Sequence, residues 1–177
     1  MRKWILICCL FALPGYLAHA DSPRQAPRFS ATDLDGDAVI LDSLLVQGPV
    51  YVTFWAIWCK SCVRELDELK PIYDQYHTRG FELVAVNEDG PRSVHRVKPM
   101  VKGKGWEFRV LLDPEKELLR TFQVISLPTS FLISQEGAII EARQGFRPGM
   151  EKLVEEHLKQ LLPEVREEEI PESEEEN

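Results

Sequence analysis

The pattern of hydrophobic and polar positions predicts alternating strands and helices between residues 29 and 162. Val50 to Ala56 is an unbroken β-branched and aromatic run, which is typical of a strand buried on both faces. From Lys60 to His77 the apolar residues recur at helical spacing, and Gly80 ends this helix before a strand over 81–86. The other predicted elements are a hairpin over 29–45 that turns at Asp35-Gly36, a weaker helix over 91–102, a strand over 108–112, a short helix with Asp113 as its N-cap and Pro114 in its first position, strands over 130–133 and 138–142, and a helix over 149–162.

This order of elements predicts an α/β fold. A strand–helix–strand connection brings its two strands into parallel pairing, whereas the hairpin that turns at Glu136-Gly137 pairs its strands antiparallel. We therefore expect one domain over residues 29–162, built on a mixed β-sheet with helices on both faces and extended by an N-terminal β-hairpin.

The first twenty residues have the features of a secretory signal peptide. Arg2-Lys3 precede an apolar run over 4–13, Pro14-Gly15 break the run, and Ala18-His19-Ala20 provides a small-x-small cleavage pattern. The run is shorter than the ~20 apolar residues of a membrane-spanning helix. The sequence thus predicts export to the periplasm and a mature chain that starts at Asp21, with an uncleaved membrane anchor as the alternative.

The charge of the chain is concentrated at its C-terminal end. The formal net charge is −8, and residues 164–177 contain eight acidic side chains and one Arg. We expect an acidic, disordered tail over 163–177 and a flexible, Pro-containing lead-in over 21–28. The body between them is only mildly acidic, which does not favour nucleic-acid binding. A monomer is expected.

Two cysteines remain once the signal peptide, with Cys8 and Cys9, is removed. A disulfide between Cys59 and Cys62 closes too small a loop to restrict the unfolded chain much, so a redox role is favoured over a structural one. The predicted helix starts near Lys60, which places Cys59 at its N-terminus. Unpaired amides and the helix dipole there favour a thiolate, the form that attacks disulfides. Cys62, one turn deeper, is then the thiol that resolves the mixed disulfide.

The cysteine pair Cys59 and Cys62 has alternatives to redox exchange. A structural zinc site needs further ligands, and His77, His95 and His157 do not stand in a ligand-like pair. No metal or other cofactor is therefore expected. An inert disulfide and a module that binds copper or a partner protein without turnover remain alternatives.

Several motifs resemble the thioredoxin superfamily, and in particular its exported TlpA/ResA-type branch, which includes reductases of cytochrome c maturation. They are Phe54-Trp-Ala-Ile-Trp-Cys-Lys-Ser-Cys-Val-Arg-Glu65, Val84-Ala-Val-Asn87, Leu112-Asp113 and Leu127-Pro-Thr-Ser-Phe-Leu-Ile133. The resemblance covers about residues 29–162. Peroxidases share this fold, but a Pro-x-x-x-Thr-x-x-Cys-like segment is absent from the sequence.

The resemblance implies substrate-facing residues around the cysteines. Pro128 takes the family's cis-proline position, with an ordinary trans-proline as the alternative, and Leu127 before it faces the bound polypeptide. Trp58 is expected to pack beside the cysteine pair and limit the access of solvent. We assign Trp58, Leu127 and Pro128 to substrate binding.

The expected proton acceptor of the reaction differs from that of thioredoxin. Thioredoxin has a buried Asp in the strand before its cysteines, and Thr53, which does not titrate, occupies that place here. Glu65 matches the Glu of the TlpA/ResA-type motif and is placed to accept the Cys62 proton. The alternative is a solvated glutamate on the helix surface. Many relatives carry a proline two residues after this Glu, where this chain has Asp67.

The expected function is that of a periplasmic thiol–disulfide oxidoreductase. Cys59, Cys62 and Glu65 form its catalytic set, and protein disulfides are its substrates, with an apocytochrome c as the candidate client suggested by the resemblance. The Glu-bearing motif resembles reductive relatives, so a reductant that draws electrons from a membrane protein is favoured. An oxidant that installs disulfides is the alternative, which the redox potential of the pair distinguishes.

Overall fold

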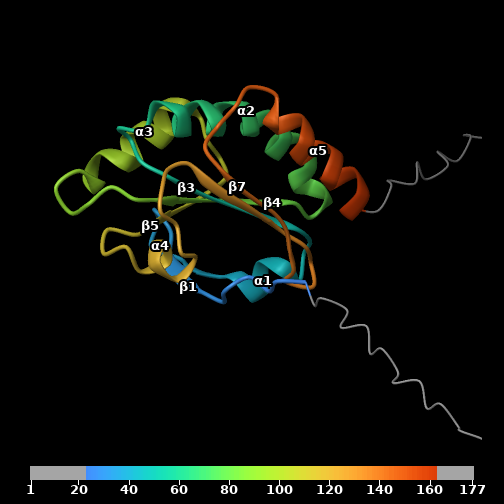
Figure 1. Cartoon of the computed structure of the whole chain (residues 1–177). Helices are drawn as coiled ribbons and strands as arrows, with labels where there is room; N and C mark the ends of the chain where they lie inside the picture. Colours follow the sequence, from blue (N-terminus) through green and yellow to red (C-terminus); the bar gives the residue numbers. More distant parts are fainter. Residues whose placement is uncertain (1–22, 163–177) are drawn as a thin grey trace, which may run out of the picture.

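The computed structural model describes residues 23–162, which form a five-stranded mixed sheet covered by helices on both faces (Figure 1). The expected fold class is thereby confirmed. The elements are β1 (Ser30–Thr32), β2 (Ala38–Ile40), α1 (Leu41–Leu45), β3 (Val50–Trp55), α2 (Lys60–Tyr76), β4 (Glu82–Asn87), α3 (Val97–Lys104), β5 (Arg109–Leu112), α4 (Glu117–Thr121), β6 (Thr129–Ile133), β7 (Ile139–Gln144) and α5 (Met150–Leu161), with 3₁₀ turns at His77–Arg79 and Val94–Arg96.

The sheet has the strand order β5-β4-β3-β6-β7. β3 pairs in parallel with β4, which pairs in parallel with β5, while β6 pairs antiparallel with β3 and β7. Trp55 lies opposite Asn87, and Phe54 lies opposite Thr129. The carboxyl ends of β3 and β4 and the amino end of β6 therefore meet at one edge of the sheet, and this edge carries the cysteines.

Alternate residues of β3 serve two separate cores. Tyr51 and Trp55 join the apolar residues of α2, α3 and α5 on one face. Val52 and Phe54 join those of α1, α4 and the β1–β2 hairpin on the other face. In Figure 1, α2, α3 and α5 lie above the sheet and α1, α4 and β1 lie below it. Because side chains of a strand alternate between faces, a strand between two helical layers is apolar along its whole length.

The structure corrects the predicted bounds of three elements. Residues 41–45, expected as part of the hairpin, form the short helix α1. The predicted helix over 91–102 begins only at Val97 and continues through Gly103 to Lys104, because Gly105 is the residue that adopts the left-handed conformation which ends it. The helix expected to start at Pro114 starts at Glu117, after Lys116 in a left-handed conformation.

The described residues begin within the expected lead-in and end at the C-terminal boundary of the predicted domain. Residues 24–26, within the expected lead-in, run beside the start of β7: Gln25 bridges Ala138, and the amide of Ile139 donates to the carbonyl of Arg24. The expected signal peptide over 1–20 and the acidic tail over 163–177 lie outside the described residues. Among the helices of residues 23–162, none has the length and apolar character needed to cross a membrane.

Candidate active site

The two cysteines form a disulfide at the start of α2. Cys59 is the N-cap residue of this helix, and its Sγ accepts a hydrogen bond from the amide of Cys62 at 3.2 Å. Cys59 is 7% exposed, whereas Cys62 is fully buried. The predicted position of Cys59 at the helix N-terminus is thus confirmed, and the amides that face its sulfur favour a thiolate in the reduced protein. Cys59 is the outer sulfur and Cys62 the inner one.

Strand pairing places the loop before β6 near the end of β3, the strand that leads into Cys59. The bond between Leu127 and Pro128 is cis, as the resemblance implied. Thr129 begins β6 directly after this bond and pairs with Phe54 near the end of β3. Because β3 and β6 run antiparallel, the strand that leads into Cys59 ends where the strand that follows Pro128 begins. The role of Leu127 and Pro128 in binding a substrate stays a prediction.

A groove of about 310 Å³ is lined by Trp58, the residue directly before Cys59, and we call it the Trp58 groove. Trp58 is 70% exposed and Ile125 is 84% exposed. Trp58 thus faces solvent more than expected for a side chain that packs beside the cysteines. The sequence pattern gave no sign of Ile125, because the loop that carries it has no periodicity. The groove is lined by Trp58, Glu88, Lys116, Leu119, Val124, Ile125, Ser126 and Leu127.

Glu65 is a buried residue, so the alternative of a solvated glutamate on the helix surface is wrong. Only 5% of it is exposed. Its Oε1 accepts hydrogen bonds from the hydroxyls of Tyr51 at 3.1 Å and Ser130 at 2.6 Å. Ser130 Oγ also lies 3.1 Å from Thr53 Oγ1. Thr53, which replaces the titrating strand residue of thioredoxin, therefore belongs to a hydroxyl cluster around the carboxyl of Glu65.

Burial raises the pKa of Glu65 above its usual value. The hydroxyls of Ser130 and Tyr51 and the positive charge of Arg143 act in the opposite direction, because they favour the ionised form. A carboxyl group with a raised pKa holds a proton more readily at neutral pH than a solvated one. Glu65 is therefore suited to exchange a proton with a neighbouring thiol.

The segment that follows β4 holds the chain that leads into Cys59. Asp89 Oδ2 accepts hydrogen bonds from the amide of Ile57 at 2.8 Å and from the side-chain amide of Asn87 at 3.0 Å. The amide of Glu88 donates to the carbonyl of Trp55 at 2.7 Å. The contacts of Asp89 with Ile57 and of Glu88 with Trp55 join residues more than thirty positions apart, and sequence reasoning did not single out Glu88 or Asp89.

Glu88 is a buried carboxyl group at the Trp58 groove. Lys116 Nζ lies 3.0 Å from Glu88 Oε2 and donates to the carbonyl oxygen of Glu88. Burial raises the pKa of Glu88 to about 7, although Lys116 lowers it. Near neutral pH this carboxyl group consequently changes its charge with little cost.

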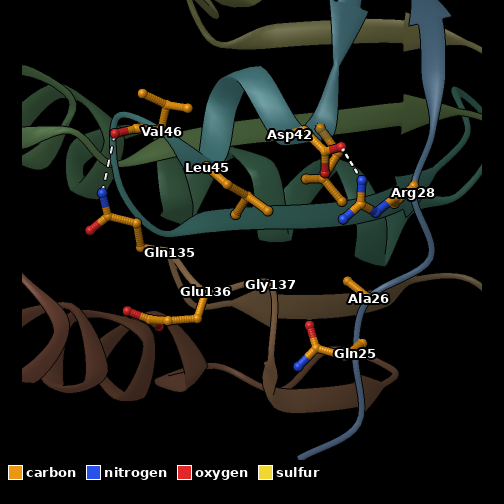
Figure 2. A pocket seen from close by; sticks show the side chains of 10 residues that line it. Gln25, Ala26, Arg28, Asp42, Leu45, Val46, Gln135, Glu136 and Gly137 are labelled. Carbon is orange, nitrogen blue, oxygen red and sulfur yellow. Dashed lines mark hydrogen bonds and ion pairs between the residues drawn. The ribbon is translucent and has the colours of Figure 1, made fainter.

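Another, larger pocket of about 540 Å³ lies away from the cysteines, between residues that precede β3 and residues that follow β6 (Figure 2). Arg28 and Asp42 form an ion pair at its rim, and Gln135 donates to the carbonyl of Val46. None of the predicted site residues lines it. Within residues 23–162, no group of three or more His, Cys, Asp or Glu side chains is arranged to hold a metal ion.

Comparison with known proteins identifies the family. Residues 23–142 match the model of the AhpC/TSA family. The chain belongs to this family. It is 35% identical over 140 residues to the thiol-disulfide oxidoreductase ResA of Bacillus thuringiensis subsp. konkukian, an alignment that covers 79% of this chain and 78% of the relative. With the ResA of Geobacillus thermodenitrificans it shares 30% identity over 172 residues, covering 92% and 95%.

The solved structures agree with this assignment. The crystal structure of a thiol:disulfide interchange protein of the thioredoxin family from Chlorobium tepidum TLS superposes with a TM-score of 0.69 at 26% identity, covering 78% of this chain and 96% of that one. With the Cys59–Cys62 pair at the start of α2, the protein is a thiol–disulfide oxidoreductase of the ResA type. The expected recognition and enzyme class are confirmed.

Proposed function

We propose that this oxidoreductase reduces disulfides of exported proteins in the periplasm, with an apocytochrome c as its client. The observation that carries the proposal is the Trp58 groove, whose exposed Trp58 directly precedes Cys59, the outer sulfur, while Cys62 is fully buried. A groove with exposed apolar side chains is suited to binding an extended polypeptide, whereas a small-molecule substrate needs no such surface. The relatives named ResA and the Glu-bearing motif favour reduction over oxidation.

The geometry supports a two-step exchange. The Cys59 thiolate attacks one sulfur of the client disulfide, so that a mixed disulfide forms and the other client sulfur leaves as a thiolate that takes up a proton. Cys62 then gives its proton to Glu65 and attacks Cys59 Sγ. The second client sulfur leaves as a thiolate that takes up a proton, so the client is released as a dithiol, and Cys59 and Cys62 remain as the disulfide seen in the structure. Two electrons from a membrane protein regenerate the dithiol.

The proposed location rests on the sequence of residues 1–20. A cleaved signal peptide releases a mature chain that starts at Asp21, and the intact mass of the exported protein measures this directly. A mass that includes Met1 to Ala20 would show that the segment is retained as an anchor.

Substitution of each cysteine in turn tests the mechanism and names the client. Cys62→Ser should attack clients but fail to release them, because only the neighbouring thiol resolves the mixed disulfide quickly. In native extracts this variant should accumulate covalent adducts that disappear with reductant, and mass spectrometry of the adducts identifies the client. Cys59→Ser is the matched control and should trap nothing.

Two other outcomes would replace the proposal. If Cys59→Ser traps clients and Cys62→Ser does not, the two cysteines exchange roles. If neither variant traps a protein and the wild type reduces no insulin disulfide, the protein is a binding module without turnover. The reduction potential of the pair separates a reductant from an oxidant, since a potential near that of DsbA, about −120 mV, would contradict reduction.

A further inference from the structure

Two buried hydroxyl groups converge on a single oxygen of Glu65. Tyr51 on β3 and Ser130 on β6 both donate to Oε1, at 3.1 Å and 2.6 Å. The Oε2 atom is also buried, and it has no hydrogen-bond partner among the described residues. The two oxygens of one carboxyl group are therefore in different states. One is held by two donors, and the other is free to bind a proton.

The difference between the two oxygens of Glu65 indicates which of them takes up a proton. Glu65 follows Cys62 by three positions on α2, so the two side chains lie on the same face of the helix, and both are buried. Donors from β3 and β6 hold Oε1 toward the sheet. A proton that reaches the carboxyl group is thus taken by Oε2, because the lone pairs of Oε1 are already engaged.

We propose that Tyr51 and Ser130 are positioning residues for proton transfer between Cys62 and Glu65. They orient the carboxyl group so that Oε2 is its proton acceptor, and they keep it ionised often enough to act as a base. The inference rests on the proton-accepting role of Glu65 in the proposed function. It adds two residues to which the sequence analysis gave no role, one on β3 and one on β6.

The charges around Glu65 agree with this role. Hydrogen bonds from Ser130 and Tyr51 lower the pKa of Glu65 against the larger effect of burial, which raises it. Burial also raises the pKa of Tyr51 well above its usual value, so its hydroxyl stays protonated and can donate to Glu65. From β7, Arg143 contributes a positive charge that favours the carboxylate, and this side chain is itself paired with Glu141.

The experiment compares Tyr51→Phe and Ser130→Ala with the wild type. The readout is the rate at which the thiol of Cys62 resolves a preformed mixed disulfide on Cys59, measured from pH 5 to 9. Loss of a donor raises the pKa of Glu65, so less carboxylate is present at neutral pH. We expect resolution about 3- to 10-fold slower at pH 7 in each variant, with recovery toward the wild-type rate at higher pH.

Tyr76→Phe is the matched control. Tyr76 lies on α2, as Glu65 does, and is also buried. Its hydroxyl donates to Glu155 at 3.1 Å, so this change removes a tyrosine–glutamate hydrogen bond without touching Glu65. Its pH profile should match that of the wild type. Ser130→Ala keeps the test decisive if Tyr51→Phe does not fold, and thermal melting establishes which variants are folded.

Glu65→Gln separates failure of this inference from failure of the function. If Glu65→Gln slows resolution while folded Tyr51→Phe and Ser130→Ala leave the pH profile unchanged, the positioning role is wrong and the proton-accepting role of Glu65 stands. If Glu65→Gln itself has no effect, both roles fall, although Cys62→Ser still reports on disulfide exchange. In the double variant Tyr51→Phe/Glu65→Gln, the effect should not exceed that of Glu65→Gln alone.

Discussion

At the scale of single residues, burial changes the acidity of Glu88. Its carboxyl group is enclosed beneath the Trp58 groove, and the ammonium group of Lys116 compensates only part of the desolvation. The pKa of Glu88 therefore rises from 4.5 to about 7. Since Lys116 directly precedes α4 and Glu88 directly follows β4, one titrating group connects two elements that border the Trp58 groove.

This raised pKa predicts how stability depends on pH. Between pH 4.5 and 7 the folded chain retains the proton of Glu88 while the unfolded chain releases it, so the free energy of unfolding falls as pH rises through this window and levels off above it. Glu88→Gln does not titrate. As the pH rises from 4.5 to 8, its free energy of unfolding should therefore increase relative to that of the wild type. The increase should be about 1–2 kcal/mol, after allowance for screening by Lys116 and water.

Urea unfolding at a series of pH values measures this difference. Glu115→Gln, an exposed change on the same side of the molecule, is the control for the loss of one acidic side chain. A difference between Glu88→Gln and the wild type that does not change with pH would contradict the raised pKa of Glu88.

At the scale of elements, α4 is held at its N-terminus by a residue outside it. The carboxylate of Asp113 accepts hydrogen bonds from the amides of Glu117 at 2.7 Å and Leu119 at 2.9 Å. Lys116, the N-cap residue, makes no cap bond with its side chain. The predicted N-cap position of Asp113 is therefore wrong, since Lys116 is the N-cap residue, but the Asp113 carboxylate caps the helix from three residues before Lys116, across the left-handed backbone of that residue.

Removal of this cap should destabilise the domain. Asp113→Ala leaves the amides of Glu117 and Leu119 without their acceptor, so the free energy of unfolding should fall by about 1–2 kcal/mol. Asp113→Asn keeps one acceptor oxygen and should lose less. As a control, Asp74→Ala removes a carboxylate that forms an exposed pair with Lys70 on α2, and should cost about 0.5 kcal/mol or less. Equal losses for the two alanine variants would argue against the cap.

At the scale of the whole molecule, two turns meet at a distance that only glycine permits. A Cβ on Gly80 would lie 2.2 Å from the carbonyl oxygen of Gln47, and one on Gly48 would lie 2.5 Å from the carbonyl oxygen of Gly80. Gly80 also has a φ of +98°, a left-handed conformation that side chains disfavour. These turns precede β4 and β3, so their approach helps to set the register of the two strands that carry the site.

Gly80→Ala should therefore be strongly destabilising, by about 3 kcal/mol or more, since strain and overpacking act together. Gly36→Ala separates the two effects. Gly36 has a φ of +94°, but nothing lies within 4 Å of the added Cβ, so only the backbone strain remains, about 1 kcal/mol. Thermal or urea unfolding of both variants measures the difference. Similar losses would show that the contact between the turns contributes little.

The sequence by itself determined the local structure of this protein and the identity of its reacting atoms. The apolar run of β3, the helical spacing of α2 and the Cys-x-x-Cys motif predict an outer sulfur at a helix N-terminus, and the structure has it there. These features depend on neighbours in the chain, so a pattern of a few residues is enough to predict them. Among the missed bounds, α1 is too short for periodicity, and α4 starts only after Lys116, whose left-handed backbone no local pattern indicated.

Only the tertiary structure decided what surrounds the sulfurs. The hydroxyl of Ser130 reaches Glu65 from 65 positions away, and Lys116 reaches Glu88 from 28 positions away. Such contacts depend on strand order and register, which no local pattern specifies. A glutamate on an amphipathic helix reads as solvated until the sheet it faces is known. Packing against β3 and β6 removes water from Glu65, and this desolvation raises the pKa of its carboxyl group above the value of a solvated glutamate.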